Sequence, residues 1–174
     1  SAGGGVQTID DVHRLLRAGA DKVIINTQAF RQPSFITQIA TLYGSQCVIV
    51  SIDAKITDQG MYQVYIAQGR ESVDRDPVSW AQEAESAGAG EILITSIDRD
   101  GMLEGYDNDL NAVICDAVGV PVLVCGGAGN WQHFVDGFHA GAAAVCTTNI
   151  YHFPETSIKN AKLYLKNAGI DVRV

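Results

Sequence analysis

One stretch of this chain occurs twice at a fixed distance. Residues 4–27 and 126–149 each contain a glycine pair, a helical pattern, Ala-Gly-Ala and an apolar run that ends in small polar residues. The copies align without a gap at a shift of 122 residues, so that Gly4-Gly5 corresponds to Gly126-Gly127. That period fits about four βα units of roughly 30 residues each, which is half of a (βα)8 barrel. The repeat therefore predicts an α/β fold of the TIM-barrel type.

The length of the chain limits how much of such a barrel it can hold. Two halves make about 244 residues, close to the roughly 250 typical of the fold, whereas the chain has 174. We therefore expect residues 1–174 to form one domain, an incomplete barrel that lacks about 70 residues at its start. The first residues of the chain are expected to follow the third strand of such a barrel. Because an open sheet leaves two unpaired edges, we also expect self-association, as a dimer.

Short apolar runs rich in Val, Ile and Leu predict five parallel strands, each buried on both faces. They are Lys22–Asn26, Cys47–Asp53, Glu91–Ser96, Val120–Cys125 and Ala143–Thr147. Amphipathic patterns predict helices at Ile9–Ala18, Pro33–Tyr43, Asp76–Ala87, Asn108–Val118, Trp131–Ala140 and Glu155–Ala168. Thr8 and Asp76-Pro77 are typical helix starts. A Gly-containing turn at 58–60 predicts a β-hairpin that joins 54–57 to 61–67 over the carboxyl ends of the strands.

Composition narrows the class of protein. The formal charge of −8, with no Lys/Arg run to offset it, argues against binding to nucleic acid or to a membrane surface. No apolar run has the length of a membrane span or the form of a secretion signal, so we expect a cytoplasmic protein. The four cysteines and four histidines show no metal-ligand spacing, so we expect reduced thiols and no metal or other cofactor.

The glycine pairs predict where anions bind. Each pair follows a strand position and precedes a helix, where backbone N–H groups and the helix dipole favour an anion. In a barrel the polar strand ends Asn26-Thr27 and Thr147-Thr148-Asn149 lie on the neighbouring loops. A single glycine pair more often serves only the geometry of a turn. Two copies, each joined to a polar strand end, favour a ligand with a phosphate at each end.

Acidic residues follow two neighbouring strands. Asp53 closes one apolar run, and the segment 97–101 closes the next. A carboxylate at the carboxyl end of a barrel strand points into the mouth of the barrel, where partial burial tunes its pKa for general acid–base catalysis. We expect Asp53 and Asp100 to carry the chemistry, and Asp98 to bond the amides of a loop.

Charged residues also stand at two strand starts. Asp21-Lys22 and Glu91 begin strands and so lie at the opposite, amino-terminal end of the barrel. Residues at that end of a barrel usually contribute to stability. We therefore expect these charged residues to form a layer of salt bridges rather than a gate for a small molecule or a contact with a partner protein.

The segments GGGVQT, GADKVIINT, VSIDAK, IDRDG, LEGYD and VCGGAG together resemble the cyclase subunits of imidazole glycerol phosphate synthase. The resemblance covers essentially the whole chain. It implies a two-fold-repeat barrel of histidine biosynthesis that takes ammonia from a glutamine amidotransferase docked at the barrel bottom. It also implies a bis-phosphorylated ribulosyl aminoimidazole carboxamide substrate, which is cleaved and cyclised to imidazole glycerol phosphate and an aminoimidazole carboxamide ribotide.

The resemblance implies roles for particular residues. Asp53 corresponds to one of the family's two catalytic aspartates. The phosphate and substrate residues are Gly5, Asn26 and Thr27 at one site, Gly126, Gly127 and Thr148 at the other, and Asp100 and Gly101 beside the substrate. Asp21 corresponds to an amidotransferase contact, and Lys22 and Glu91 correspond to a charged ammonia gate.

Other features favour two alternatives. Met102-Leu103-Glu104, Cys125 and the segment 149–152 depart from the histidine enzyme and resemble paralogues that pair with amidotransferases in acetamidino-sugar biosynthesis for surface glycans. The family's other catalytic aspartate lies on a first strand that residues 1–174 do not contain. A truncated, catalytically impaired module that binds phosphate or a partner is therefore the second alternative.

Overall fold

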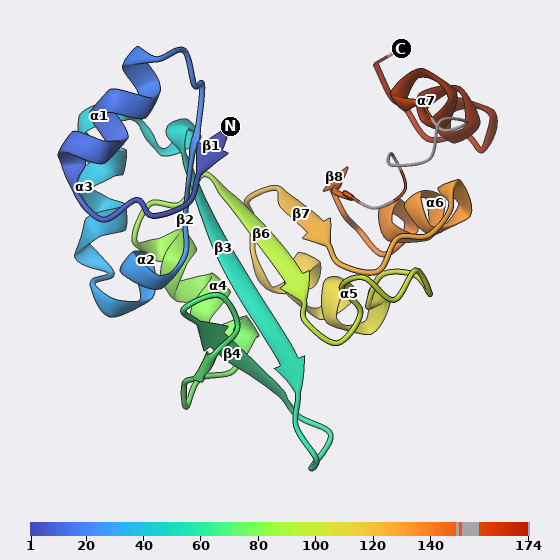
Figure 1. The fold of residues 1–174 in the computed structure, drawn as a ribbon, viewed down its shortest axis with the longest axis horizontal. Helices are drawn as coiled ribbons and strands as arrows, with labels where there is room; N and C mark the ends of the chain where they lie inside the picture. Colours follow the sequence, from blue (N-terminus) through green and yellow to red (C-terminus); the bar gives the residue numbers. More distant parts are fainter. Residues whose placement is uncertain (149, 151–156, 174) are drawn as a thin grey trace.

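A parallel sheet with helices packed along it forms the frame of the molecule (Figure 1). The computed structural model describes residues 1–148, 150 and 157–173. Within them the parallel strands are β1 (Ala2–Gly3), β2 (Val23–Ile25), β3 (Val48–Ile56), β6 (Glu91–Ser96), β7 (Val122–Cys125) and β8 (Ala144–Val145). They lie side by side in that order, so the spatial order follows the chain order. Crossovers between parallel strands are as a rule right-handed, so crossovers that all step in the same direction place their helices on one face of the sheet. The strand order thus confirms an incomplete barrel of the predicted type.

The helices begin close to where the sequence predicts them. They are α1 (Ile9–Arg17), α2 (Thr27–Arg31), α3 (Ser34–Tyr43), α4 (Pro77–Ser86), α5 (Asn108–Ala117), α6 (Trp131–His139) and α7 (Ile158–Asn167), with a 3-10 turn η1 at Ser45–Cys47. The short helix α2 is not predicted. Residues 155 and 156 of the last predicted helix lie outside the described residues, as do Asn149, Tyr151 and His152.

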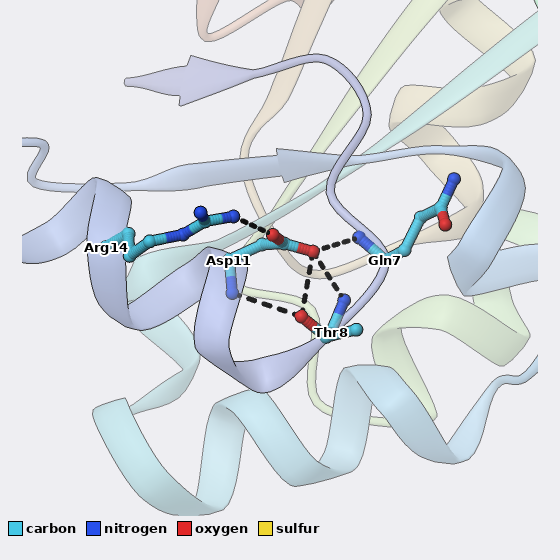
Figure 2. Close-up of polar contacts among 4 residues, drawn as sticks. All are labelled: Gln7, Thr8, Asp11 and Arg14. Carbon is cyan, nitrogen blue, oxygen red and sulfur yellow. Dashed lines mark hydrogen bonds and ion pairs between the residues drawn. The ribbon is translucent and has the colours of Figure 1, made fainter.

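Figure 2 shows the start of α1, which confirms the expected cap. The Thr8 N–H donates to Asp11 Oδ2 at 2.9 Å, and the Asp11 N–H donates to Thr8 Oγ1 at 3.2 Å, a reciprocal capping box. Hydrogen bonds from the Gln7 and Thr8 backbone and the Thr8 hydroxyl, together with the Arg14 guanidinium, hold the pKa of Asp11 far below its usual range. This network fixes the loop that carries Gly4-Gly5 onto α1.

The two faces of the sheet are buried to different degrees. Side chains that point toward the helices form the core, among them Val23, Val50, Ile94 and Val124, which are fully or almost fully buried. Residues at the alternate positions of β6, such as Leu93, are only half-buried. The prediction of strands buried on both faces is therefore confirmed for β3, in which residues 48–52 are all buried. It is wrong for β2, β6 and β7, where the positions that alternate with the core are only partly buried.

The predicted hairpin is present, and it changes the boundary of the strand before it. β3 continues past Asp53 to Ile56 and pairs antiparallel with β4 (Tyr62–Ile66), which pairs in turn with β5 (Glu71–Ser72). Asp53 faces Thr95 of β6 on one side and Tyr65 of β4 on the other. The sequence predicts Asp53 as the last residue of its strand, and this prediction is wrong. It lies where the hairpin branches from the parallel sheet.

The sheet also begins earlier than predicted. Ala2 and Gly3 pair in parallel with Val23 and Ile24, so the described chain contributes six parallel strands and not five. An Ala-Gly pair carries no hydrophobic signal, which is why the sequence pattern misses it. β1 and β8 form the two ends of the strand order, and self-association across them stays a prediction. No helix in the described part of the chain combines the length and the apolar character needed to cross a bilayer.

Candidate active site

The loops at the carboxyl ends of the parallel strands bring the predicted residues to one end of the sheet. Gly5 follows β1 and Asn26-Thr27 follows β2, at one side of the strand order. Gly126-Gly127 follows β7 and Thr148 follows β8, at the other side. β3, which contains Asp53, and β6, which leads to Asp100, lie between them. The two predicted phosphate motifs therefore flank the predicted catalytic acids.

Asp53 is a half-buried carboxylate with one direct polar partner. Asn26 Nδ2 donates to Asp53 Oδ2 at 3.0 Å. Burial raises the pKa of Asp53, the Asn26 hydrogen bond partly offsets that rise, and the negative charge of Asp100 adds to it. A raised carboxyl pKa at the point where the hairpin leaves the parallel sheet is the property expected of a general acid or base.

The neighbouring acids divide into two roles. Asp100 is exposed and close enough for its charge to affect Asp53. Asp98 accepts a hydrogen bond from the Ile56 N–H at 2.8 Å, which confirms that it bonds a backbone amide. Asp98 therefore anchors the hairpin, and Asp53 and Asp100 are the carboxylates left to face a ligand.

The first hollow lies beside the first glycine pair and has a volume of about 680 Å³. Gly5, Asn26, Thr27 and Asp53 all line it. Thr27 Oγ1 accepts a hydrogen bond from the Ala67 N–H at 2.9 Å, which leaves the hydroxyl hydrogen free to donate. The structure therefore joins one predicted phosphate motif and the predicted catalytic carboxylate in a single cavity.

The second hollow is narrow, about 20 Å³, and gathers the other predicted residues. Its lining residues are Asp100, Gly101, Leu103, Cys125, Gly126, Gly127, Ala128, Cys146, Thr147 and Thr148. Burial raises the pKa of the Cys125 thiol, and it raises that of Cys146 to about 11. Both groups are therefore neutral thiols near pH 7 and contribute shape rather than a nucleophile.

The charges at the strand starts form an ion pair at the opposite end of the sheet. Lys22 Nζ contacts Glu91 Oε1, and both side chains are partly buried. Since β2 and β6 flank β3, this pair spans the amino-terminal end of β3. Asp21 is exposed beside it. The expected salt bridge is therefore present, and it lies far along the strands from Asp53.

Two contacts at the site are not predicted from the sequence. One is the hydrogen bond from Asn26 to Asp53, since Asn26 is expected only to bind phosphate. The other joins the hairpin to the next loop: the Tyr62 hydroxyl donates to Asp107 Oδ1 at 2.8 Å, and burial and Asp107 raise the pKa of Tyr62 to about 12. Asp107 also caps α5 through the Leu110 N–H. The hairpin is thereby tied to the loop that carries Asp100.

Comparisons with known proteins show the family to which the chain is similar. The family model described as "Histidine biosynthesis protein" matches residues 1–157. The imidazole glycerol phosphate synthase subunit HisF of Campylobacter concisus (strain 13826) is 47% identical over 174 residues. That alignment covers 100% of this chain and 68% of the relative.

Proposed function

The chain belongs to the HisF family of histidine biosynthesis proteins, and we propose that it uses ammonia from a glutamine amidotransferase to cleave and cyclise a bis-phosphorylated aminoimidazole carboxamide ribotide. It is a cyclase subunit of the imidazole glycerol phosphate synthase type. The observation that carries the proposed reaction is the half-buried Asp53, whose raised pKa and central position suit proton transfer between two anion-binding ends.

The spacing of the strands supports a ligand with two phosphates. From β2, which leads to Thr27, to β7, which leads to Gly126, there are three strand intervals. At about 4.8 Å each they span roughly 14 Å, a length suited to an extended sugar–imidazole bis-phosphate. A molecule held at both ends would lie across Asp53 and Asp100, and that positioning lowers the entropic cost of reaction.

Asp53 is the group that we assign to proton transfer. Because Asn26 donates to its Oδ2, the carboxyl group is oriented and Oδ1 remains available to the substrate. Its raised pKa increases the fraction of the protonated form near neutral pH, so the group can give a proton as well as take one. Asp100 keeps a second negative charge beside it and strengthens that tendency.

The first test is anion binding by residues 1–174. Titration with inorganic phosphate or sulfate is expected to shift the backbone amide NMR signals at Gly5 and Thr27 and also at Gly127 and Thr148, because these residues line the two hollows and we assign anion binding to their loops. A crystal soaked with sulfate should hold an anion at each site. If neither set of signals moves while the glycine loops are ordered, the phosphate assignment fails.

Turnover separates an enzyme from a module that only binds. A completed barrel can be built by fusing residues 1–174 to the part of the Campylobacter concisus subunit that the alignment leaves uncovered. Ammonia-dependent turnover of the bis-phosphate by this completed barrel supports the proposed reaction. Anion binding without turnover would instead favour the binding module, and turnover of an acetamidino-sugar precursor alone would favour the paralogue.

The Lys22–Glu91 pair gives a test of ammonia delivery. We propose that ammonia enters at the end of the sheet where this pair lies, so Glu91→Gln should reduce glutamine-dependent turnover on the order of tenfold relative to ammonia-dependent turnover. Both rates are measured on the completed barrel with a cognate amidotransferase. Arg75→Gln, which breaks the remote Arg75–Glu83 pair, is the matched control. An equal loss of both rates in Glu91→Gln would indicate a purely structural role.

A further inference from the structure

The wall of the first hollow includes a turn that the proposed function does not use. Ala67, Gln68 and Gly69, which connect β4 to β5, all have positive φ, at 53°, 63° and 73°. For Ala and Gln that conformation is unfavourable and persists only where the surroundings impose it. The hydrogen bond from the Ala67 N–H to Thr27 Oγ1 supplies such a constraint. The turn is therefore folded onto the predicted phosphate residues.

This turn and the end of α2 bring two arginines to the first hollow. Arg70 follows the turn, Arg31 ends α2, and both line the cavity that holds Gly5, Thr27 and Asp53. Arg31 Nη2 lies 3.2 Å from Glu71 Oε2. Arg70 has no ion-pair partner among the residues that the structure describes. Among the residues that line the hollow there are therefore two guanidinium groups and one carboxylate, that of Asp53, while Glu71, the partner of Arg31, lies outside the lining.

The second hollow has the opposite electrostatic character. Among the described residues that line it, none is Lys or Arg, and Asp100 contributes a carboxylate. Its donors are backbone N–H groups and the hydroxyls of Thr147 and Thr148. The sequence repeat makes the two glycine loops alike, whereas the charges around them differ.

We propose that Arg31 and Arg70 recognise the phosphate bound in the first hollow, so that this end of the substrate is selected by charge and the other end by neutral donors. The inference rests on the proposed function, because it assigns additional residues to one of the two proposed phosphate sites. A guanidinium matches two oxygens of a dianionic phosphomonoester at once, which a backbone amide cannot do. Arg31 and Arg70 are therefore specificity-determining residues for the bis-phosphate.

The Arg31–Glu71 pair does not prevent this role. The side chains of Arg31 and Glu71 are 57% and 53% exposed, and ion pairs that exposed are weak. A phosphate dianion at the hollow can therefore compete with Glu71 for the guanidinium. Glu71 holds Arg31 near the hollow until a phosphate binds.

The test uses Arg31→Gln, Arg70→Gln and the double variant, each titrated with inorganic phosphate. We expect the Kd that is read from the Gly5 and Thr27 amides to rise about three- to fivefold in each single variant and about tenfold or more in the double variant. The Kd read from Gly127 and Thr148 should stay unchanged. Added salt should weaken binding at the first hollow and have less effect in the double variant. Arg75→Gln carries the same charge change outside the hollow and should bind as the parent does.

The outcomes separate this inference from the proposed function. If phosphate binds both hollows of the parent chain and the arginine variants bind it equally well, the arginine assignment fails and the phosphate sites stand. If phosphate binds neither hollow of the parent chain, the proposed function fails first. In the completed barrel the double substitution should raise the KM for the bis-phosphate and leave kcat nearly unchanged. The reason is that the arginines would bind the phosphate equally well in the ground state and in the transition state. A fall in kcat at unchanged KM would also overturn the assignment.

Discussion

Asp53→Asn is expected to reduce the ammonia-dependent kcat of the completed barrel by at least about 100-fold, because general acid–base catalysis by one group contributes roughly 100- to 10,000-fold. Asparagine keeps the size of the side chain and can still accept the Asn26 hydrogen bond, so the change removes the proton-transfer group and little else. The measurement is kcat under saturating ammonia. Residues 1–174 alone are expected to be nearly inactive, and the substitution should change little there. Turnover that survives it would remove Asp53 from the mechanism.

Stability provides the control for that variant. Since burial raises the pKa of Asp53 in the folded state, the ionised carboxylate destabilises the fold at neutral pH, and this cost disappears as the pH falls through the folded pKa. The Asp53→Asn variant should therefore melt no lower than the parent near pH 7. Any advantage should disappear under acidic conditions, where both side chains are neutral. If the variant melts far below the parent at pH 7, misfolding rather than the loss of a proton-transfer group would explain its lost activity.

Gly127→Ala is expected to be the most damaging change to the fold among the site residues. Gly127 has a φ of +107°, and an added Cβ would overlap the Gly105 carbonyl oxygen and lie 2.9 Å from Arg99 Cβ. Because the first of these neighbours is backbone, it cannot move aside without breaking the hydrogen bond from Gly105 N–H to Gly127 O. We expect a loss of about 3 kcal/mol or more in the free energy of unfolding. Thermal melting should fall by roughly 6–12 °C, and phosphate binding at the second hollow should be lost.

Gly5→Ala is the matched control at the other copy of the repeat. Gly5 also has a positive φ, +69°, but an added Cβ there would meet nothing within 4 Å. Only the cost of the left-handed backbone remains, about 1–2 kcal/mol. Equal destabilisation by the two substitutions would show that collision with the loop at Gly105 does not matter.

The sequence predicts the parts of the fold whose signals are local. β6 is predicted at the same residues, Glu91–Ser96, and the caps at Thr8 and Asp76 are confirmed. Helix α2 is missed because its five residues have no side-chain cap and are held by the burial of Ala29 rather than by propensity. The extension of β3 beyond Asp53 is missed because it depends on pairing with β4. The pattern of apolar and polar residues along the chain does not show which strands pair.

The site is predicted where strand order alone decides it. Placing Asp53 and Asp100 between two glycine motifs requires only that consecutive parallel strands be neighbours. The hydrogen bonds from Asn26 to Asp53 and from Tyr62 to Asp107 join residues 27 and 45 positions apart, and they depend on side-chain geometry. The arginines of the first hollow are also beyond prediction, because an unusual turn brings Arg70 to α2.

The agreement between strand order and chain order bears on how the protein is synthesised. Apart from the hairpin, each strand pairs with the strands before and after it in the chain, so the sheet can grow unit by unit from its amino-terminal end. At about 5–20 residues per second, a βα unit of roughly 30 residues leaves the ribosome in ~2–6 s, far longer than hydrophobic collapse requires. The residues that line the first hollow all lie between Gly4 and Arg70, whereas the second hollow needs residues 100–148. The cationic end of the site can therefore assemble on the nascent chain while the neutral end is still being translated.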